Sequence, residues 1–187
     1  MLDATKFHVR ILDDTQIEEI DEKMADFDAE SAGDLAQPIK KGTLCAAKFE
    51  ADDGWYRAKV IQPHGKGIIE VHFIDYGNVE KVSQADLKVL PNDLLAYPPQ
   101  VTECTLAYVK APRIERQFGK AAAQVLQDIA LDKVSEAIVV GKQGQRMGLV
   151  IFEEGVKDWD KSVNAILVDK ALASISVDQK SAPEQIL

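Results

Sequence analysis

The sequence predicts a mainly β protein with a few helices, an α+β fold, in which a small, strongly bent barrel is inserted into a second, β-rich lobe. The first observation is that four or five short strand patterns, separated by turn residues, follow one another between Thr43 and Leu90. So many short strands in so short a segment favour a small barrel over an open sheet. The second observation is that the strand and helix patterns on either side are too few for either flank to close a sheet alone. We therefore expect the two flanks to form one lobe together, around the inserted barrel.

The segment before the barrel predicts one strand and one amphipathic helix. Residues Phe7–Leu12 alternate apolar and polar side chains, which is typical of a strand with one buried face. Thr15 can cap a helix that runs to about Ala29, and Glu18 stands at the capping-box position three residues later. The apolar residues that recur at helical spacing, and so predict a buried face, are Ile17, Ile20, Met24 and Phe27.

The barrel segment consists of strand patterns joined by turn signals. A hairpin turn is expected at Asp52-Asp53-Gly54, a second turn at His64-Gly65-Lys66-Gly67 and a third at Gly77-Asn78. The expected strands are Leu44–Glu50, Trp55–Gln62, Ile68–Tyr76 and a short last strand within Val79–Leu90. This succession of short strands and tight turns is the pattern that predicts the barrel.

The segment after the barrel predicts the rest of the second lobe. A strand is expected at Gln100–Val109 and a helix at about Arg116–Ala130. The apolar positions of that helix are Phe118, Ala122, Val125, Leu126 and Ile129. Two strands follow at Glu136–Gly144 and Arg146–Glu154, then a helix near Ser162–Ala173. The residues after this helix are typical of a frayed tail.

Composition and charge limit the classes of function. The chain has 187 residues, of which 46% are hydrophobic and 28% charged, as in an ordinary globular protein. It carries 31 acidic and 22 basic residues, a net charge of −9. This balance disfavours direct nucleic-acid binding, which depends on neutralising phosphates with Lys and Arg, and it favours a cationic partner. No apolar run is long enough to span a membrane, and the start lacks the apolar core of a signal peptide, so we expect a cytoplasmic protein without a membrane partner.

No motif in the sequence supports catalysis, a metal or a cofactor. A serine nucleophile elbow and a His-Glu-x-x-His zinc motif are both missing. The histidines and the two cysteines show no metal-ligand spacing, and Cys45 and Cys104 are expected to be buried free thiols. The adjacent acid pairs Asp52-Asp53 and Glu153-Glu154 are expected to be solvated turn charges, because neighbours on a strand point to opposite faces. The sequence therefore predicts a protein that is not an enzyme.

Four aromatic residues stand at the predicted strand ends of the barrel. Phe49 ends one strand and Tyr56 begins the next across a tight turn, while Phe73 and Tyr76 end the third strand. Strict alternation would place Phe73 and Tyr76 on opposite faces, so the meeting of all four rings requires a bend at the end of this strand. Four such rings can form a box for a cation with spread charge, and Asn78 can accept a hydrogen bond from its N–H group. The alternative is that the rings form the barrel's own core.

Two stretches, AKFEADDGWYRAKV and VHFIDYGNVEKV, resemble the core of a Tudor domain, and the run Asp-Tyr-Gly-Asn is the most specific part. The flanks are similar to those of the extended Tudor domain, so that the resemblance covers about residues 5 to 175. It implies an SH3-like Tudor barrel inserted into an OB lobe like that of staphylococcal nuclease (the SN-like lobe), joined by a long helix. The expected bounds are 1–39 for the first part of the SN-like lobe and the linker helix, 40–92 for the Tudor barrel, 93–177 for the remainder of the lobe and 178–187 for a disordered tail.

The resemblance also implies a function. Extended Tudor domains bind symmetrically dimethylated arginine in the Arg-Gly and Arg-Ala rich N-terminal tails of Piwi-family proteins. They act as scaffolds in cytoplasmic germ granules (nuage and polar granules) and in the piRNA pathway. Asp75 is expected to support the rim of the site rather than touch the ligand. The matching positions of the aromatic cage and its polar contact are Phe49, Tyr56, Phe73, Tyr76 and Asn78.

A different member of the family suggests an alternative. The Tudor–nuclease co-activator usually has Tyr where this chain has Phe73. By that comparison the second lobe is a vestigial nuclease-like lobe or binds single-stranded RNA, which would need a basic, aromatic groove. The sequence shows no such groove after Val101 beyond scattered basic residues, and Asn78 disfavours a methyl-lysine reader. We therefore expect a non-catalytic methylarginine reader without a cofactor.

Overall fold

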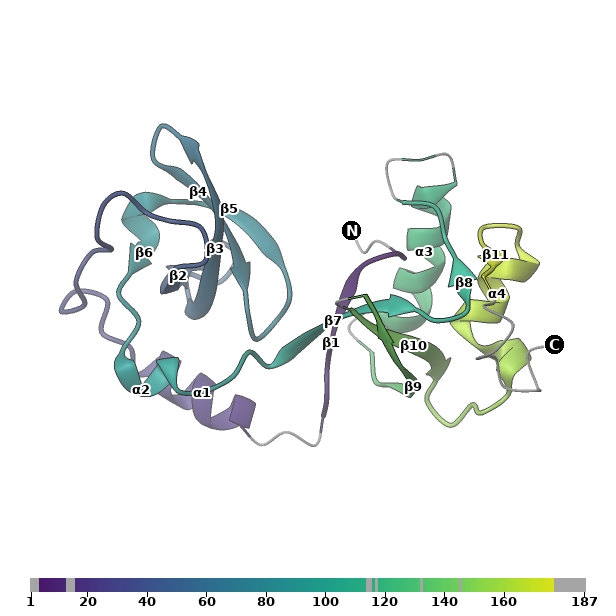
Figure 1. The fold of residues 1–187 in the computed structure, drawn as a ribbon. Helices are drawn as coiled ribbons and strands as arrows, with labels where there is room; N and C mark the ends of the chain where they lie inside the picture. The colour runs from purple at the N-terminus through teal and green to yellow at the C-terminus, as the bar shows by residue number, and fades with distance from the viewer. Residues whose placement is uncertain are drawn as a thin grey trace. The chain divides into compact units, whose positions relative to one another are not determined.

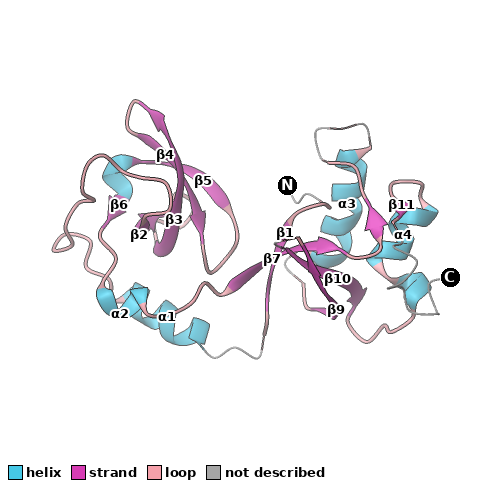
Figure 2. Ribbon diagram, in the orientation of Figure 1, coloured by secondary structure: helices cyan, strands magenta, loops and turns pink. Residues whose placement is uncertain are grey.

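The computed structural model of the chain describes residues 4–12, 16–113, 116, 118–131, 133–144 and 146–176 (Figure 1). These residues fall into two compact units. Residues 9–101 form the first, which we call the barrel unit, and the described parts of 1–8 and 102–187 form the second, which we call the flanking unit. Both units combine strands with short helices, which confirms the predicted mainly β fold with helices (Figure 2).

The barrel unit is built on a five-stranded antiparallel sheet in the order β5-β4-β3-β2-β6. The strands are β2 (Leu44–Lys48), β3 (Trp55–Gly65), β4 (Ile68–Phe73), β5 (Val79–Ser83) and β6 (Leu87–Lys88). The register between β3 and β4 shifts twice, once between Val60 and Gln62 and once between Pro63 and Gly65. Such bulges bend a strand and increase its twist, so they allow the sheet to curl around a core. The small, strongly bent barrel predicted from the sequence is confirmed.

The barrel core is formed by the inward-facing residues of these strands. Burial alternates along β4, so that Ile69, Val71 and Phe73 face inward. This alternation is the period-two pattern of a strand with one buried face. Phe49 and Tyr56 pack against the same core with part of each ring exposed. The other buried members of the core are Leu35, Ile39, Cys45, Ala47, Ala58, Val60, Val82 and Leu87.

Two helices pack on this barrel. In α1 (Gln16–Ala25) the predicted buried positions Ile20 and Met24 are 1% and 5% exposed. They form a second cluster with Leu94 of α2 (Asn92–Leu95), a short helix that the sequence analysis did not predict. The barrel unit therefore includes residues on both sides of the predicted barrel bounds of 40 and 92.

The helix predicted to run to about Ala29 ends instead at Ala25. The chain turns after this residue, and the backbone N–H of Phe27 donates to the carbonyl of Met24 at 3.2 Å. The turn lays the Phe27 ring against Trp55, with ring centroids 5.6 Å apart. Burial of this ring against β3 thus ends the helix earlier than its apolar spacing indicates. The predicted cap, Thr15, lies outside the described residues.

A four-stranded sheet in the order β1-β7-β10-β9 belongs mostly to the flanking unit, while Val9 and Arg10 at the end of β1 and Val101 at the start of β7 belong to the barrel unit. These strands are β1 (Phe7–Arg10), β7 (Val101–Leu106), β9 (Ser135–Gln143) and β10 (Arg146–Glu153). β10 runs parallel to β7 and forms an antiparallel hairpin with β9. The flanking unit is completed by a two-stranded sheet of β8 (Val109–Lys110) and β11 (Ser174–Ile175), and by α3 (Gly119–Ala130) and α4 (Val163–Asp169).

A buried asparagine ties α4 to the sheet. Asn164 is fully buried, and its Nδ2 donates to the carbonyls of Ala107 at 2.8 Å and Leu149 at 3.0 Å. Its Oδ1 accepts from the backbone N–H of Ile151 at 3.2 Å. One neutral side chain therefore bonds three backbone groups, of which the Leu149 carbonyl also accepts from the backbone N–H of Ala107 at 2.7 Å.

Two element bounds in the flanking unit need correction because of backbone conformation. The strand predicted at Gln100–Val109 is divided into β7 and β8, since Tyr108 adopts a left-handed conformation with a φ of 60°. The helix predicted from about Arg116 begins at Gly119. Phe118, which was expected on the buried face of this helix, has a φ of 65° and is 58% exposed.

The C-terminal part of the chain is described only to residue 176. The helix predicted near Ser162–Ala173 ends at Asp169, and β11 follows. The predicted tail, residues 178–187, lies outside the described residues. Within the described ranges, no helix combines the length and the apolar character that crossing a membrane requires.

Candidate functional site

The first two rings of the predicted cage come from the β2–β3 hairpin. Phe49 directly follows β2, and its backbone N–H donates to the carbonyl of Gly54 at 2.8 Å. Tyr56 is the second residue of β3, and its ring lies over the turn. A Cβ on Gly54 would stand 2.8 Å from the Tyr56 ring, closer than side-chain carbons approach one another. Only glycine at this position leaves the space that the tyrosine ring occupies.

The other two rings come from the end of β4. The chain bends directly after Phe73, where the N–H groups of Tyr76 and Gly77 both donate to the Phe73 carbonyl, at 3.3 and 2.7 Å. Gly77 has a φ of 91°, a conformation that other residues rarely adopt. The bend that the meeting of the rings requires is therefore present, and it returns Tyr76 toward the hairpin.

The four rings lie together, and the neighbouring rings meet at near-right angles. Tyr56 is central, with ring centroids 6.1 Å from Phe49, 6.2 Å from Phe73 and 5.2 Å from Tyr76. Phe49 and Phe73 are 5.5 Å apart, and the interplanar angles of all four pairs lie between 77° and 85°. Phe73 is 1% exposed and belongs to the barrel core, whereas Tyr76 is 45% exposed. The cluster therefore begins in the core and ends at the surface. Its buried end belongs to the barrel core, and the box for a cation stays a prediction.

The predicted polar contact, Asn78, lies in the same turn as Tyr76. Its carbonyl accepts from the backbone N–H of Phe73 at 3.0 Å, and the residue is half-buried. This bond closes the turn across the end of β4. The contact of its side-chain amide with a ligand stays a prediction.

Asp75, the predicted supporting residue, is buried in an ion pair. Its carboxylate accepts from Arg57 Nε at 2.8 Å and Nη2 at 2.6 Å, and from the backbone N–H of Gln100 at 3.2 Å. The remaining N–H groups of Arg57 donate to the carbonyls of Leu94, Tyr97 and Pro98, at 2.8, 2.8 and 2.9 Å. All five N–H groups of the guanidinium therefore have partners, which is the condition under which a buried charge pair is tolerated.

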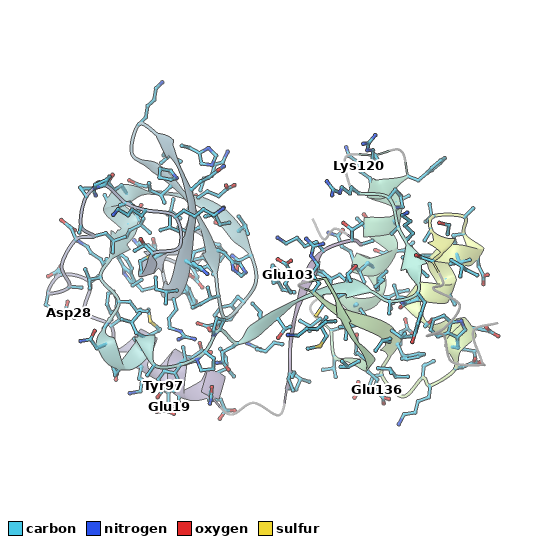
Figure 3. The ribbon with its side chains drawn as sticks, in the orientation of Figure 1. Glu19, Asp28, Tyr97, Glu103, Lys120 and Glu136 are labelled. Carbon is cyan, nitrogen blue, oxygen red and sulfur yellow. The ribbon has the colours of Figure 1, made fainter. Side chains whose placement is uncertain are left out.

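Tyr97 extends this network to α1. Its ring centroid lies 5.9 Å from the Arg57 guanidinium carbon, and its hydroxyl donates to Glu19 of α1 (Figure 3). The turn that carries Tyr76 is thus anchored through Asp75 and Arg57 to the segment around α2. Sequence reasoning missed Arg57, because its partners are 18 to 41 positions away and no local pattern marks it.

Both tyrosine hydroxyls of the cluster donate to carboxylates. Tyr56 donates to Asp52 Oδ2 and Tyr76 donates to Asp21 Oδ1, each at 2.7 Å. The bond to Asp52 raises the pKa of Tyr56 to about 12 and lowers the pKa of Asp52. Partial burial and the bond to Asp21 raise the pKa of Tyr76 above that of a free phenol. Both side chains therefore stay protonated, and remain hydrogen-bond donors, throughout the physiological range.

Three charged side chains lie near the rings, and the sequence offered a local signal for one of them. Asp52 is exposed in the hairpin turn, and its spacing of four residues from Tyr56 is a signal that could have paired them. Asp21 lies 55 positions from Tyr76, so no spacing could have linked them. Arg10 was also missed: its guanidinium carbon lies 5.8 Å from the centroid of the Tyr76 ring. The surface end of the cluster therefore carries two carboxylates and one guanidinium.

The remaining candidate chemistry is limited. Cys45 and Cys104 are free and buried, as predicted, and burial raises their thiol pKa values to about 12 and about 11. Among the residues that the structure describes, no three His, Cys, Asp or Glu side chains are grouped so that they could hold a metal ion. The aromatic cluster is thus the strongest candidate for a binding site.

Comparison with known proteins gives relatives for both units. The family model of the Tudor domain matches residues 2–108. In an alignment of 202 residues the chain is 28% identical to Ribonuclease TUDOR 2 of Arabidopsis thaliana; the alignment covers 98% of this chain and 20% of that protein, so the chain spans a fifth of that relative's length.

Solved structures are similar over nearly the whole chain. The extended Tudor domain TD3 of mouse TDRD1, in complex with a MILI peptide containing dimethylarginine, has 26% sequence identity and a TM-score of 0.81, covering 95% of this chain and 90% of that one. A variant of the extended Tudor domain of Drosophila melanogaster Papi, in complex with a methylated Piwi N-terminal peptide, has 23% identity and a TM-score of 0.77, covering 94% and 95%. The second likeness, at its lower identity, is one of fold alone.

Proposed function

The chain belongs to the Tudor domain family and has the fold of an extended Tudor domain, and on this premise we propose that it is a non-catalytic reader of symmetrically dimethylated arginine. Its ligand is the Arg-Gly or Arg-Ala rich N-terminal tail of a Piwi-family protein. The protein acts as a scaffold in cytoplasmic germ granules of the piRNA pathway. The observation that carries this proposal is the cluster of four rings at near-right angles, with an exposed tyrosine at its surface end.

The aromatic cluster suits a methylated guanidinium for physical reasons. The faces of Phe49, Tyr56, Phe73 and Tyr76 are negative, and a cation whose charge is spread and weakly hydrated gains most from them. Methylation keeps the charge of arginine, removes N–H donors that would need water, and adds apolar surface that packs on rings. The complex of mouse TDRD1 with a dimethylarginine peptide supports the same ligand for this similar fold.

Asn78 gives the proposed site its preference among methylated forms. Symmetric dimethylation leaves one N–H on each substituted nitrogen, and the amide oxygen of Asn78 can accept from it. Trimethyl-lysine has no such donor, and in asymmetric dimethylarginine one terminal nitrogen has none. Asp75, buried beneath the turn, holds the rim in place without touching the ligand.

The test is a calorimetric titration with four matched peptides. They carry unmodified arginine, asymmetric dimethylarginine, symmetric dimethylarginine or trimethyl-lysine in one Arg-Ala rich sequence. We expect the symmetric form to bind most tightly, since among the four it alone carries a methyl group for the rings and an N–H for Asn78 on the same terminal nitrogen. Asn78→Ala should cost about 1–3 kcal/mol of binding free energy for the symmetric form and reduce its advantage over the asymmetric one. Equal affinity of the wild type for methylated and unmodified peptides would refute the proposal.

The alternative function is RNA binding or a vestigial nuclease-like activity of the flanking unit. It is favoured by one observation, the 28% identity with a plant protein named as a ribonuclease. The net charge of −9 opposes it, because the approach of phosphates is disfavoured by an acidic surface. A filter-binding and cleavage assay with single-stranded RNA at physiological salt distinguishes the two. Submicromolar binding or cleavage of the RNA would favour the alternative.

A further inference from the structure

We propose that Asp21 and Asp52 are specificity-determining residues of the aromatic cluster, which select a cationic ligand over a neutral ligand of the same shape. This inference rests on the proposed function, because it concerns how the rings hold a methylated guanidinium. Neither carboxylate needs to touch the ligand. Each acts through the tyrosine hydroxyl that donates to it at 2.7 Å.

The two carboxylates reach the cluster from separate parts of the chain. Asp52 belongs to the turn between β2 and β3, and Asp21 belongs to α1. Their partners, Tyr56 and Tyr76, are the two tyrosines of the cluster, whereas Phe49 and Phe73 have no hydroxyl to bond. Every hydroxyl in the cluster is therefore bonded to a carboxylate, by two independent connections.

The physical effect of these bonds is on the attraction of positive charge. A phenol that donates to a carboxylate gains negative charge on its oxygen and ring, and a more negative ring face attracts a cation more strongly. The carboxylate adds a direct Coulomb attraction, which is moderated by water at an exposed rim. A neutral ligand of the same shape gains from neither effect, although its packing on the rings is the same. The bonds should therefore change selectivity for charge more than overall binding.

Arg10 supplies an opposing charge on the same tyrosine. Its guanidinium carbon lies 5.8 Å from the Tyr76 ring centroid, so the ring already interacts with one cation. A second cation on this ring is repelled by the first. Loss of Arg10 should raise the preference for a charged ligand, and loss of Asp21 should lower it. Opposite effects at one ring are not expected from general damage to the fold.

The experiment compares a charged and a neutral peptide of closely matched shape. One carries ω-N-monomethylarginine, and the other carries ω-N-methylcitrulline, in which a urea oxygen replaces the unmethylated terminal nitrogen of the guanidinium. Calorimetric titrations give the ratio of the two affinities for the wild type, Asp21→Asn, Asp52→Asn, the double variant and Arg10→Gln. The matched control is Asp34→Asn, since Asp34 is exposed and paired with Lys88 at 2.6 Å. This control changes the net charge by the same amount at a carboxylate that bonds no ring of the cluster.

We expect each single Asn variant to reduce the affinity ratio about threefold and the double variant about tenfold, as for charges near a protein surface. Arg10→Gln should increase the ratio, and Asp34→Asn should leave it within about twofold because exposed charges at a distance are screened. Affinity for the neutral peptide should stay constant throughout. In a Tyr56→Phe background, which keeps the ring, Asp52→Asn should have a smaller effect, because the two residues act through one bond.

The outcomes separate this inference from the function on which it rests. Failure of the wild type to bind the methylated arginine peptide overturns both. Tight binding by the wild type, with the same affinity ratio in Asp21→Asn, Asp52→Asn and Asp34→Asn, overturns the role of the carboxylates and leaves the reader function standing. An equal loss of affinity for both peptides in Asp21→Asn and Asp52→Asn would mean that the carboxylates only hold the rings in place. That result also overturns their role in selecting charge.

Discussion

Aromatic rings meet edge to face in both units, yet the two units use them differently. In the flanking unit Tyr108 and Trp159 lie 6.1 Å apart and pack against a buried cluster around Val150. In the barrel unit the cluster starts at the buried Phe73 and ends at Tyr76, which is 45% exposed. The contrast is one of exposure. In the barrel unit a strand end and a bend leave one ring at the surface, as the proposed site requires.

The two units also differ in the buried polar side chains that stabilise each of them. The flanking unit relies on Asn164, a neutral amide that bonds three backbone groups. The barrel unit relies on a charged pair, Arg57 with Asp75, and on three further carbonyls. A charged group left without its partner is far more costly to bury than a neutral one. The barrel unit should therefore be the more sensitive of the two to loss of its polar side chain.

The largest expected effect is that of Asp75→Ala. Arg57 is 1% exposed, so the variant leaves a buried guanidinium without its counter-charge, and the barrel unit should lose about 3–5 kcal/mol of unfolding free energy. Trp55 lies in the barrel unit and Trp159 in the flanking unit, so urea unfolding followed by fluorescence in a Trp159→Phe background reports the barrel. Asp34→Ala, at an exposed ion pair with Lys88 in the same unit, is the control and should change the midpoint little. An unfolding midpoint of Asp75→Ala equal to that of the control would show that the pair is not needed.

A smaller loss is expected from Asn164→Ala in the flanking unit. The change removes the partner of the Ala107 carbonyl and of the Ile151 N–H and leaves no charge unpaired, so the cost should be about 2–3 kcal/mol. Urea unfolding of a Trp55→Phe background measures this unit, and Gln124→Ala, an exposed amide on α3 of the same unit, serves as control. A greater loss here than in Asp75→Ala would reverse the comparison between the two units.

Tyr76→Ala should affect binding rather than stability. The ring is partly exposed, so its removal should leave cooperative unfolding of the barrel intact, while affinity for a symmetrically dimethylated peptide falls at least about tenfold. Calorimetry measures the binding, and Trp159→Ala gives the corresponding loss of a ring in the flanking unit. That variant should leave peptide affinity unchanged. Intact binding by Tyr76→Ala would show that the exposed ring is not part of the site.

The smallest effect is expected at the two cysteines. Their rates of reaction with a thiol reagent measure how readily each unit opens. Because burial raises the thiol pKa values of Cys45 and Cys104 to about 12 and about 11, almost no reactive thiolate exists at pH 8. An aromatic disulfide reagent should therefore label neither cysteine in the native protein and both in urea. Rapid labelling of only one native cysteine would identify the unit that opens more readily.

Local patterns in the sequence predicted the elements wherever side-chain spacing decides burial. Ile20 and Met24 were expected on the buried face of a helix and lie there, and the strands of the barrel follow the predicted order. The element ends were less predictable. Phe27 lies beyond the end of its predicted helix and packs on Trp55, a contact distant in sequence that outweighs helical spacing. Phe118 has a left-handed backbone conformation and precedes its predicted helix.

For the candidate site, the sequence by itself determined which rings stand at strand ends and that Gly77 permits a bend beside them. Only the tertiary structure decided the near-right angles between the rings, the burial of Asp75 against Arg57, and the bond from Tyr76 to Asp21. The physical reason is that alternation and helical period describe neighbours along the chain. A hydrogen bond between residues 55 positions apart depends on how α1 packs on the barrel, and no local pattern carries that information.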